Sequence, residues 1–281
     1  MSDIAKIKEI RERTGIGFGD CKKALAASDW DVEKAIDHIR KQSAVKAAKK
    51  ADRTAAEGRL AIKIADDGKS GAIVEINVET DFAARNERFG AFCDTAVDTV
   101  LRDGPDSLET LDGLRKELVQ TIGENVSLRR ADRFVAKSDD GFVSSYLHTN
   151  GVVGTLVEMS SGDDQTARDV AMHVTASEPL VVNADDLPES VVAKERDILL
   201  EQARDSGKPE NIIEKMVEGR LRKFRAESCL SEQPFVKDPE QKVSDVLKSR
   251  NAACERFVRY QVGEGIEKRE DDLAAEVQKL I

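Results

Sequence analysis

The chain has 281 residues, of which 40% are hydrophobic and 35% charged, and its formal net charge is −10 at pH 7. A general nucleic-acid binder normally carries a strongly basic face, so this charge balance argues against that class. No stretch approaches the ~18 consecutive apolar residues of a membrane span, and the first residues lack the apolar core of a signal peptide. We therefore expect a cytoplasmic protein of two or three compact units.

Residue types that commonly carry chemistry are scattered along the sequence. The four cysteines form no CxxC pair, which favours reduced, partly buried thiols. The three histidines show no metal-ligand spacing, and the chain has no P-loop motif. We expect no metal, no cofactor, no directly bound nucleotide and no enzymatic activity. Acidic residues are nevertheless too numerous for counting alone to exclude an unrecognised catalytic site.

Residues 1–53 are expected to form an N-terminal module of three short helices with a linker. Ile4, Ile7 and Ile10 recur on one helical face, and Asp31 is placed to cap the third helix. A core of this size is small. Such modules usually bind another surface rather than perform chemistry.

The linker, residues 41–53, is rich in lysine and alanine, with Val45 as its one large apolar residue. This composition fits either a solvated helical linker or a tether that carries positive charge toward an acidic partner. From Glu57 the period of apolar residues changes from about 3.6 to about 2, which marks the start of a β-containing core.

The core is expected to contain two related α+β halves. Each half begins with a β-hairpin, whose turns are predicted at Asp67-Gly68 and at Asn150-Gly151. Each hairpin is followed by helices and then by a closing strand.

An internal repeat relates the two halves. Gly71 matches Gly154 at an offset of 83 residues, whereas the following helices align Asp94 with Asp169 at an offset of 75. The first copy therefore carries eight additional residues between its strand and its helix. They fall within the stretch VETDFAARNERF, residues 78–89, and the function of this insertion becomes the central question.

The expected fold class is α+β, with five segments in all. The core comprises subdomain N, residues 54–140, and subdomain C, residues 141–186 and 229–263. Residues 187–228 form an inserted antiparallel helical hairpin with coiled-coil spacing, which either packs only against itself or also contacts a partner. Residues 264–281 end the chain as a C-terminal module with an amphipathic helix.

Eight short segments, in order from Arg11 to Lys268, resemble the bacterial elongation factor Ts family. Any single segment is a weak signal, but their order over nearly the whole chain is specific. The segments are IRERTG with DCKKAL, KAAKKA, VETDFAARN, IGENVSLRR, VAMH, GKPENIIEKMVEGR, QPFV and VGEGIEK.

The resemblance implies a guanine-nucleotide exchange factor for the GTPase elongation factor Tu. In that family a Thr-Asp-Phe turn inserts its aromatic ring between two helices of the GTPase and disturbs the magnesium site. The matching positions are Thr80, Asp81, Phe82 and Ala83, which we call the TDFA turn. Ala83 stands where many relatives carry the bulkier valine, so the wedge is expected to be slightly smaller.

The resemblance also implies further contacts with the GTPase. His148 matches a family position at the end of the second hairpin that touches elongation factor Tu. The alternative is a solvent-exposed or capping histidine with no contact to a partner. The N-terminal module resembles a ubiquitin-associated domain and is expected to dock on the GTPase domain. The C-terminal module is expected to contact that domain near the guanine-recognition side.

Two other classes of function stay open from the sequence alone. An RNA- or ribosome-associated protein would use the basic segments KAAKKADR and SLRR, although the acidic balance argues against it. An enzyme would need a catalytic constellation, and none is recognisable.

Overall fold

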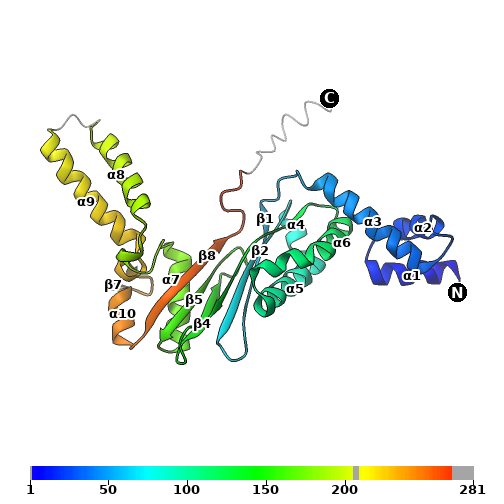
Figure 1. Ribbon diagram of the computed structural model, residues 1–281, viewed down its shortest axis with the longest axis horizontal. Coiled ribbons are helices and arrows are strands. Elements are labelled where there is room, and N and C mark those ends of the chain that lie inside the picture. Colours follow the sequence, from blue (N-terminus) through cyan, green and yellow to red (C-terminus); the bar gives the residue numbers. More distant parts are fainter. Residues whose placement is uncertain (1, 205–208, 268–281) are drawn as a thin grey trace. The chain divides into compact units, whose positions relative to one another are not determined.

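The computed structural model describes residues 2–204 and 209–267 (Figure 1). It is an α+β fold in which N-terminal helices precede antiparallel sheets with associated helices. This confirms the fold class expected from the sequence. Most of the expected C-terminal module, residues 268–281, lies outside the described residues.

The described part of the chain forms two compact units, whose boundaries pass through strands. The first unit lies within residues 1–61, 73–132 and 260–281, and the second within residues 62–72 and 133–259. The five segments expected from the sequence stay a prediction.

Three helices open the first unit, and the local sequence explains their ends. Ser2 caps the first helix by accepting a hydrogen bond from the backbone N–H of Ala5, and Gly15 ends it in the left-handed conformation, with φ at 73°. Asp31 caps the third helix through the N–H of Lys34, as expected. The helices are α1 (Asp3–Thr14), α2 (Phe18–Ala26) and α3 (Val32–Lys50).

Buried apolar residues hold these helices together. They include Ile7, Ile10, Leu25 and Ile36. Ile4 does not join them, because 60% of it is exposed. The apolar face predicted for the first helix is therefore only partly used for packing within the module.

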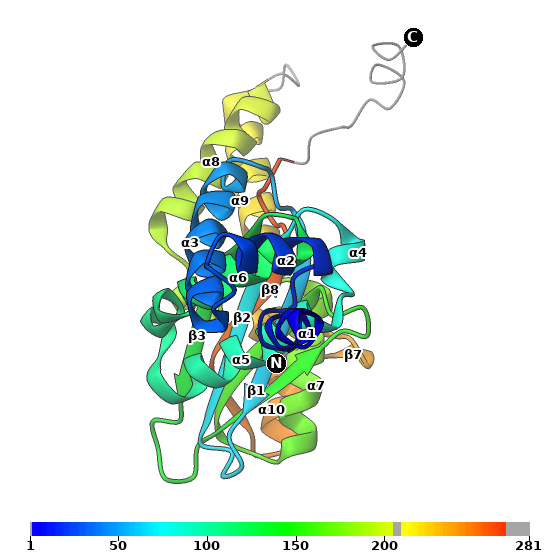
Figure 2. The same cartoon turned by 90° about the vertical axis from the view of Figure 1, so that its right-hand side faces the viewer.

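The predicted linker is helical as far as Lys50, and one face of this helix is buried rather than solvated. α3 continues to Lys50, and both Ser43 and Ala47 on it are 1% exposed. Figures 1 and 2 show α3 beside α6 (Asp112–Ile122), where Ser43 donates a hydrogen bond to the side chain of Gln120. Small residues on one stripe of α3 allow this close approach, which a Lys- and Ala-rich composition does not reveal.

The first three-stranded sheet has the order β1–β2–β3. Its strands are β1 (Glu57–Ile64), β2 (Ser70–Val78) and β3 (Val126–Val135). Between β2 and β3 the chain forms α4 (Asp81–Ala84), α5 (Glu87–Asp103), the short 3-10 helix η1 (Pro105–Leu111) and α6. The apolar stripe of α5 is buried, so this helix belongs to the core of the unit.

The second three-stranded sheet has the order β4–β5–β8. The pairing of β4 with β5 is antiparallel and runs from Phe142 opposite Met159 to Leu147 opposite Gly154. Helix α7 packs on both strands. The strands are β4 (Phe142–Leu147), β5 (Val153–Ser161) and β8 (Ala253–Gln261), and α7 is Asp164–Ser177.

Five short elements belong to the second unit, and apolar side chains of η3, β6 and α10 join one buried cluster with α7. The pair β6–β7 was not expected from the sequence. These elements are η2 (Ala184–Asp186), η3 (Leu230–Glu232), β6 (Pro234–Phe235), β7 (Asp238–Lys242) and α10 (Val243–Ser249).

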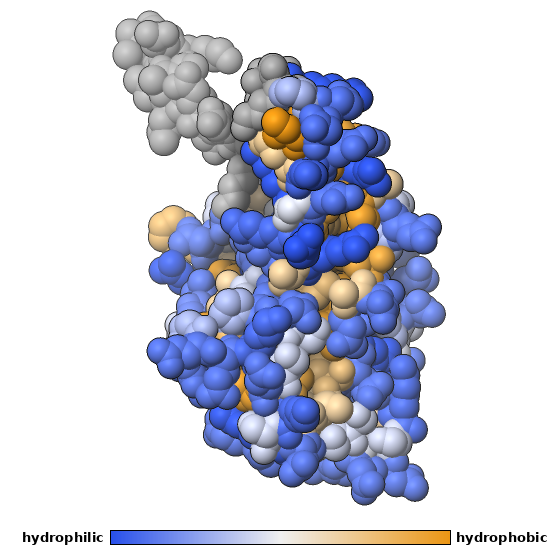
Figure 3. All heavy atoms as spheres, turned by 90° about the vertical axis from the view of Figure 1, so that its left-hand side faces the viewer, coloured by the Kyte–Doolittle hydropathy of each residue, from blue (hydrophilic) through white to orange (hydrophobic). Residues whose placement is uncertain are grey.

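Two longer helices, α8 (Glu189–Arg204) and α9 (Glu210–Ser228), pack against each other. Their shared cluster consists of Leu199, Ala203, Ile213 and Val217. Figure 3 views the molecule from the side of this pair, and the surface is mainly hydrophilic with scattered apolar groups. That this pair is a coiled coil, and that it contacts a partner, both stay predictions.

Candidate partner-binding turn

The TDFA turn follows directly after a central strand and is fixed at both ends. β2 ends at Val78, and α4 is a single helical turn that begins at Asp81. Thr80 caps α4, because its Oγ1 accepts a hydrogen bond from the N–H of Ala83 at 3.2 Å. Asn86 caps α5 in the same way through the N–H of Arg88, at 2.9 Å. These caps on either side restrict the backbone conformation of the turn.

Phe82 points away from the fold. It is 81% exposed, more than any other large hydrophobic residue in the described parts of the chain. Its neighbours Ala83 and Ala84 are each 6% exposed, so the turn directs small residues inward and the aromatic ring outward. Such a ring has no packing role in the isolated chain and is available to a partner.

The other members of the turn are held by local contacts. Asp81 forms an ion pair with Arg85, with 3.0 Å between Oδ2 and Nη2, and both side chains are at least half exposed. Exposed pairs of this kind are weak, so the Asp81 carboxylate can exchange this partner for another. Ala83 is buried in its own unit, and its predicted contact with the partner stays a prediction.

His148 lies in the second unit, apart from the TDFA turn in the chain. It follows β4 in an exposed loop, and its Nδ1 lies 3.3 Å from the hydroxyl oxygen of Tyr146. Its backbone N–H donates to the carbonyl of Val153 at 2.9 Å, which closes the hairpin. The ring is therefore accessible, while the backbone that carries it is fixed.

Two residues next to the turn were missed by reasoning from the sequence. Glu124 and Asn125 lie in the loop before β3, and they contact Thr80 and Glu79, the residues that follow β2. They belong to the segment IGENVSLRR, which carried part of the family resemblance. Periodicity gives no signal for them, because they lie in a loop and their partners are more than forty positions earlier in the chain.

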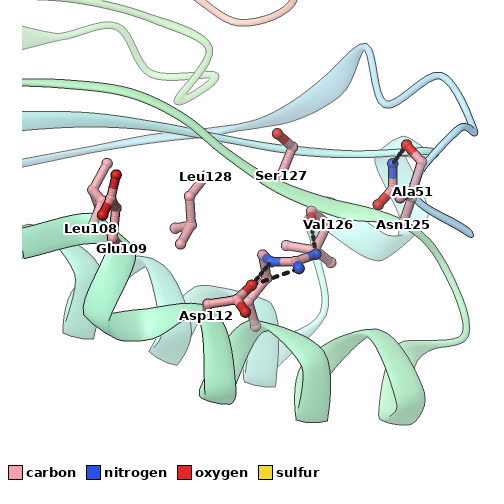
Figure 4. Close-up of a pocket in the computed structure, with 9 residues that line it drawn as sticks. Ala51, Leu108, Glu109, Asp112, Asn125, Val126, Ser127 and Leu128 are labelled. Carbon is pink, nitrogen blue, oxygen red and sulfur yellow. Dashed lines mark hydrogen bonds and ion pairs between the residues drawn. The ribbon is translucent and has the colours of Figure 1, made fainter. Parts of the chain in front are cut away.

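A groove of about 540 Å³ lies between η1, α6 and β3 (Figure 4). Its one arginine, Arg115, is already occupied: Asp112 accepts from its Nε at 2.9 Å, and the carbonyl of Val126 accepts from its Nη1 at 3.1 Å. The guanidinium therefore serves to join α6 to β3.

The structure also bears on the other classes of site. Across residues 2–204 and 209–267, no group of three His, Cys, Asp or Glu side chains is placed to hold a metal ion. The same residues contain no helix that is long and apolar enough to span a membrane. All four cysteines are free and buried, and burial raises the pKa of Cys93 and of Cys254 to about 12. These two thiols stay protonated near neutral pH, and thiols are poor nucleophiles.

The basic segments that favoured RNA binding are largely occupied within the fold. Arg129 and Arg130 both bind the buried carboxylate of Glu75, at 2.7 and 2.6 Å. Lys50 donates a hydrogen bond to the carbonyl of Gly123. Cations engaged in this way are not free to neutralise a phosphate backbone, which weakens the RNA-binding hypothesis.

Comparison with known proteins identifies the family. The family model for elongation factor TS matches residues 79–264. The chain is 49% identical over 277 residues to elongation factor Ts of Teredinibacter turnerae, with 96% of this chain and 94% of that protein covered. It is 50% identical over 281 residues to elongation factor Ts of Alkalilimnicola ehrlichii, with 96% and 95% covered. For the protein of Methylococcus capsulatus the values are 47% over 286 residues, with 98% and 97% covered. The chain belongs to the elongation factor Ts family.

Proposed function

We propose that this chain is a guanine-nucleotide exchange factor for elongation factor Tu, and that it promotes GDP release by inserting Phe82 beside the magnesium site. Family membership supports the exchange activity and the partner. The wedge rests on one observation: Phe82 is 81% exposed on a turn that is capped at both ends. Translation elongation in the cytoplasm is the setting for this activity.

Exchange of this kind requires differential binding rather than bond chemistry. The factor must bind the nucleotide-free GTPase more tightly than the GDP form, and by linkage GDP weakens its binding equally. Moving an equilibrium from 1:99 to 99:1 takes about 5.5 kcal/mol of differential affinity. Burying one phenylalanine side chain contributes roughly 1.5–3 kcal/mol. Phe82 therefore supplies a large part of the difference, and the remaining surfaces supply the rest.

The magnesium ion is the point at which a small displacement has a large effect. Mg²⁺ requires near-ideal octahedral geometry and usually keeps several of its waters. A ring inserted beside it shifts the ligands, and the Asp81 carboxylate competes for the groups that hold the water shell. GDP then loses the charge neutralisation of its phosphates, so its dissociation becomes faster.

Additional docking by the N-terminal module is part of this proposal. Two of its apolar side chains, Ile4 and Phe18, are 60% and 49% exposed. Exposed apolar residues on a small module are suited to burial against a partner. This contact would add affinity and hold the TDFA turn close to the nucleotide site.

Stopped-flow release of a fluorescent GDP analogue from purified elongation factor Tu tests the proposal. We expect the release rate to rise with the concentration of this chain and then to saturate. Removing Mg²⁺ beforehand should reduce the additional acceleration, since the chain then has less to displace. An unchanged release rate over the whole concentration series would refute the exchange activity. An acceleration equal with and without Mg²⁺ would refute the magnesium mechanism alone.

A further inference from the structure

Two adjacent residues that follow β2, Glu79 and Thr80, exchange hydrogen bonds with two adjacent residues that precede β3, Glu124 and Asn125. The Glu124 carboxylate accepts from the backbone N–H of Thr80 at 2.9 Å and from the Thr80 hydroxyl at 2.8 Å. In return, the Glu79 carboxylate accepts from the backbone N–H of Asn125 at 2.6 Å. The segments after β2 and before β3 are therefore joined by a reciprocal pair of carboxylate–amide contacts. We call these four residues, Glu79, Thr80, Glu124 and Asn125, the Glu79–Asn125 node.

The node also reaches the segment that follows α3. The side-chain amide of Asn125 donates to the carbonyl of Arg53 at 2.8 Å and to that of Ala51 at 3.3 Å. Asn125 is only 6% exposed, so these bonds are largely protected from water. Three segments of the first unit thus meet at one point, immediately beside the TDFA turn.

Glu124 controls the hydroxyl that caps α4. Since the Thr80 hydroxyl donates its proton to Glu124, its oxygen lone pairs face the N–H of Ala83, from which it accepts at 3.2 Å. The chain of bonds from Ala83 through Thr80 to Glu124 ends on a charge, and hydrogen bonds to charged groups are about twice as strong as neutral ones. The carboxylate therefore fixes both the backbone and the side chain of the capping residue.

A turn as short as α4 needs support of this kind. Helix nucleation is unfavourable, and four residues are far too few to stay helical on their own. Phe82 cannot supply the support, because its ring is 81% exposed. The position of the ring therefore depends on the backbone beneath it. That backbone is held by the buried alanines, by the exposed Asp81–Arg85 pair and by the node.

We propose that Glu124 is a positioning residue for nucleotide exchange: through Thr80 it holds the TDFA turn in the orientation in which Phe82 enters the partner. This rests on the proposed function. Preorganisation of an inserted group lowers the entropy lost on binding, so a loosened turn would insert less effectively. Glu124 itself is not expected to touch the GTPase.

Glu124→Ala removes both bonds to Thr80, and Glu124→Gln retains one acceptor for the Thr80 N–H. The measured quantity is the slope of the GDP release rate against the concentration of this chain. We expect this slope to fall about tenfold for the alanine variant and by an intermediate factor for the glutamine variant. Glu109→Ala removes an exposed glutamate of the same unit and should leave exchange unchanged. Circular dichroism and thermal unfolding check that each variant folds; if the alanine variant does not, the glutamine variant carries the test.

The decisive comparison repeats Glu124→Ala in a Phe82→Ala background. If Glu124 acts by positioning the ring, the second substitution should cause little further loss. A further tenfold loss in that background would overturn the positioning role while leaving the exchange function intact. Hydrogen exchange at the Ala83 amide gives a readout that needs no GTPase: it should be faster in Glu124→Ala than in wild type, and equal rates would overturn the proposal. If wild type failed to accelerate GDP release, only the proposed function would fall, and the amide measurement would still test the support of the turn.

Discussion

Glu75 and Glu158 lie 83 positions apart and occupy equivalent places in the two three-stranded sheets. Each is on the middle strand, β2 or β5, and their side chains are 0% and 1% exposed. Each carboxylate accepts from the Nε of an arginine on the third strand, Arg130 for Glu75 and Arg256 for Glu158, at 2.6 Å in both sheets. This offset equals that of the predicted hairpin repeat, and it supports a common origin of the two halves.

The third strands show the same correspondence with a different offset. The guanidinium of Arg130 on β3 lies 4.1 Å from the ring centroid of Tyr260 on β8, and that of Arg256 on β8 lies 4.1 Å from the ring centroid of Phe134 on β3. The two arginines, Arg130 and Arg256, are 126 positions apart, and so are the two aromatic residues, Phe134 and Tyr260. The additional residues of the second half therefore lie between β5 and β8, where α8 and α9 are found.

Glu75→Gln is expected to destabilise the protein. Burial would raise the pKa of Glu75, but hydrogen bonds from the N–H of Gly263 and from Arg129 and Arg130 outweigh it, so the pKa is lowered. The ionised carboxylate thus stabilises the fold at neutral pH, and this contribution is lost as the pH falls through its folded pKa. Removing one partner of a buried ion pair costs about 3 kcal/mol or more, to be measured by urea unfolding at pH 7.

Glu264→Gln is the matched control for this prediction. Glu264 also contacts Arg130, at 3.0 Å, but its side chain is 51% exposed. Loss of an exposed pair should cost less than about 1 kcal/mol. Equal losses of unfolding free energy in the two variants would show that the buried ion pairs of Glu75 stabilise the fold no more than the exposed pair of Glu264 does.

Phe82→Ala should slow GDP release from elongation factor Tu about 10- to 100-fold, as expected when a ring worth roughly 1.5–3 kcal/mol no longer inserts. The free energy of unfolding should change by less than about 0.5 kcal/mol, because the side chain is already 81% exposed. Leu114→Ala, at a residue of the same unit that is 48% exposed, should leave release unchanged. Wild-type release rates for Phe82→Ala would rule out the wedge.

The elements with strong local signals could be predicted from the sequence. The hairpin turns were recognisable because Asp67-Gly68 and Asn150-Gly151 interrupt alternating strands, and the structure joins β1 to β2 and β4 to β5 there. The exposure of Phe82 was expected from the family resemblance and the insertion, and not from periodicity.

Other features depend on contacts between distant residues and left no local signal. Alternation along β2 marks Glu75 as a polar, outward position, yet both faces of this strand are buried and arginines of β3 neutralise it. The bonds from Glu124 to Thr80 span 44 positions, and the packing of α3 on α6 joins Ser43 to Gln120. Such pairings appear only when the chain has folded.

His148→Ala tests the second predicted contact with the GTPase. The residue is exposed in the β4–β5 loop, so its loss should leave the free energy of unfolding within about 0.5 kcal/mol of wild type. We expect the dissociation constant of the complex with nucleotide-free elongation factor Tu to rise several-fold, as measured by titration calorimetry. Thr149→Ala, at the next exposed position, serves as the control. An unchanged dissociation constant would place His148 outside the interface.

His173 should make the fold sensitive to mild acid. It is 0% exposed, its Nδ1 accepts from the N–H of Val236 at 3.1 Å, and its Nε2 lies 2.8 Å from Oε1 of Gln233. Burial lowers the pKa of His173, and the hydrogen bond to Gln233 opposes this only in part. The unfolded chain, with a pKa near 6.5, therefore binds the proton first, and stability is lost as the pH falls below that value.

The expected loss for His173 is up to about 1.4 kcal/mol per pH unit below its unfolded pKa, until its folded pKa is reached. Urea unfolding at about pH 7.5 and about pH 5.5 measures it. The pKa of Glu75 is lowered, so its contribution to the free energy of unfolding is lost only at more acidic pH. It therefore does not change between these two pH values. His173→Gln should remove most of the slope, whereas His38→Gln, at a surface position on α3, should retain it. Equal unfolding free energies of wild type at the two pH values would contradict this prediction, because the ring would then accept a proton inside the fold. The geometry opposes that protonation, since the N–H of Val236 already donates to Nδ1.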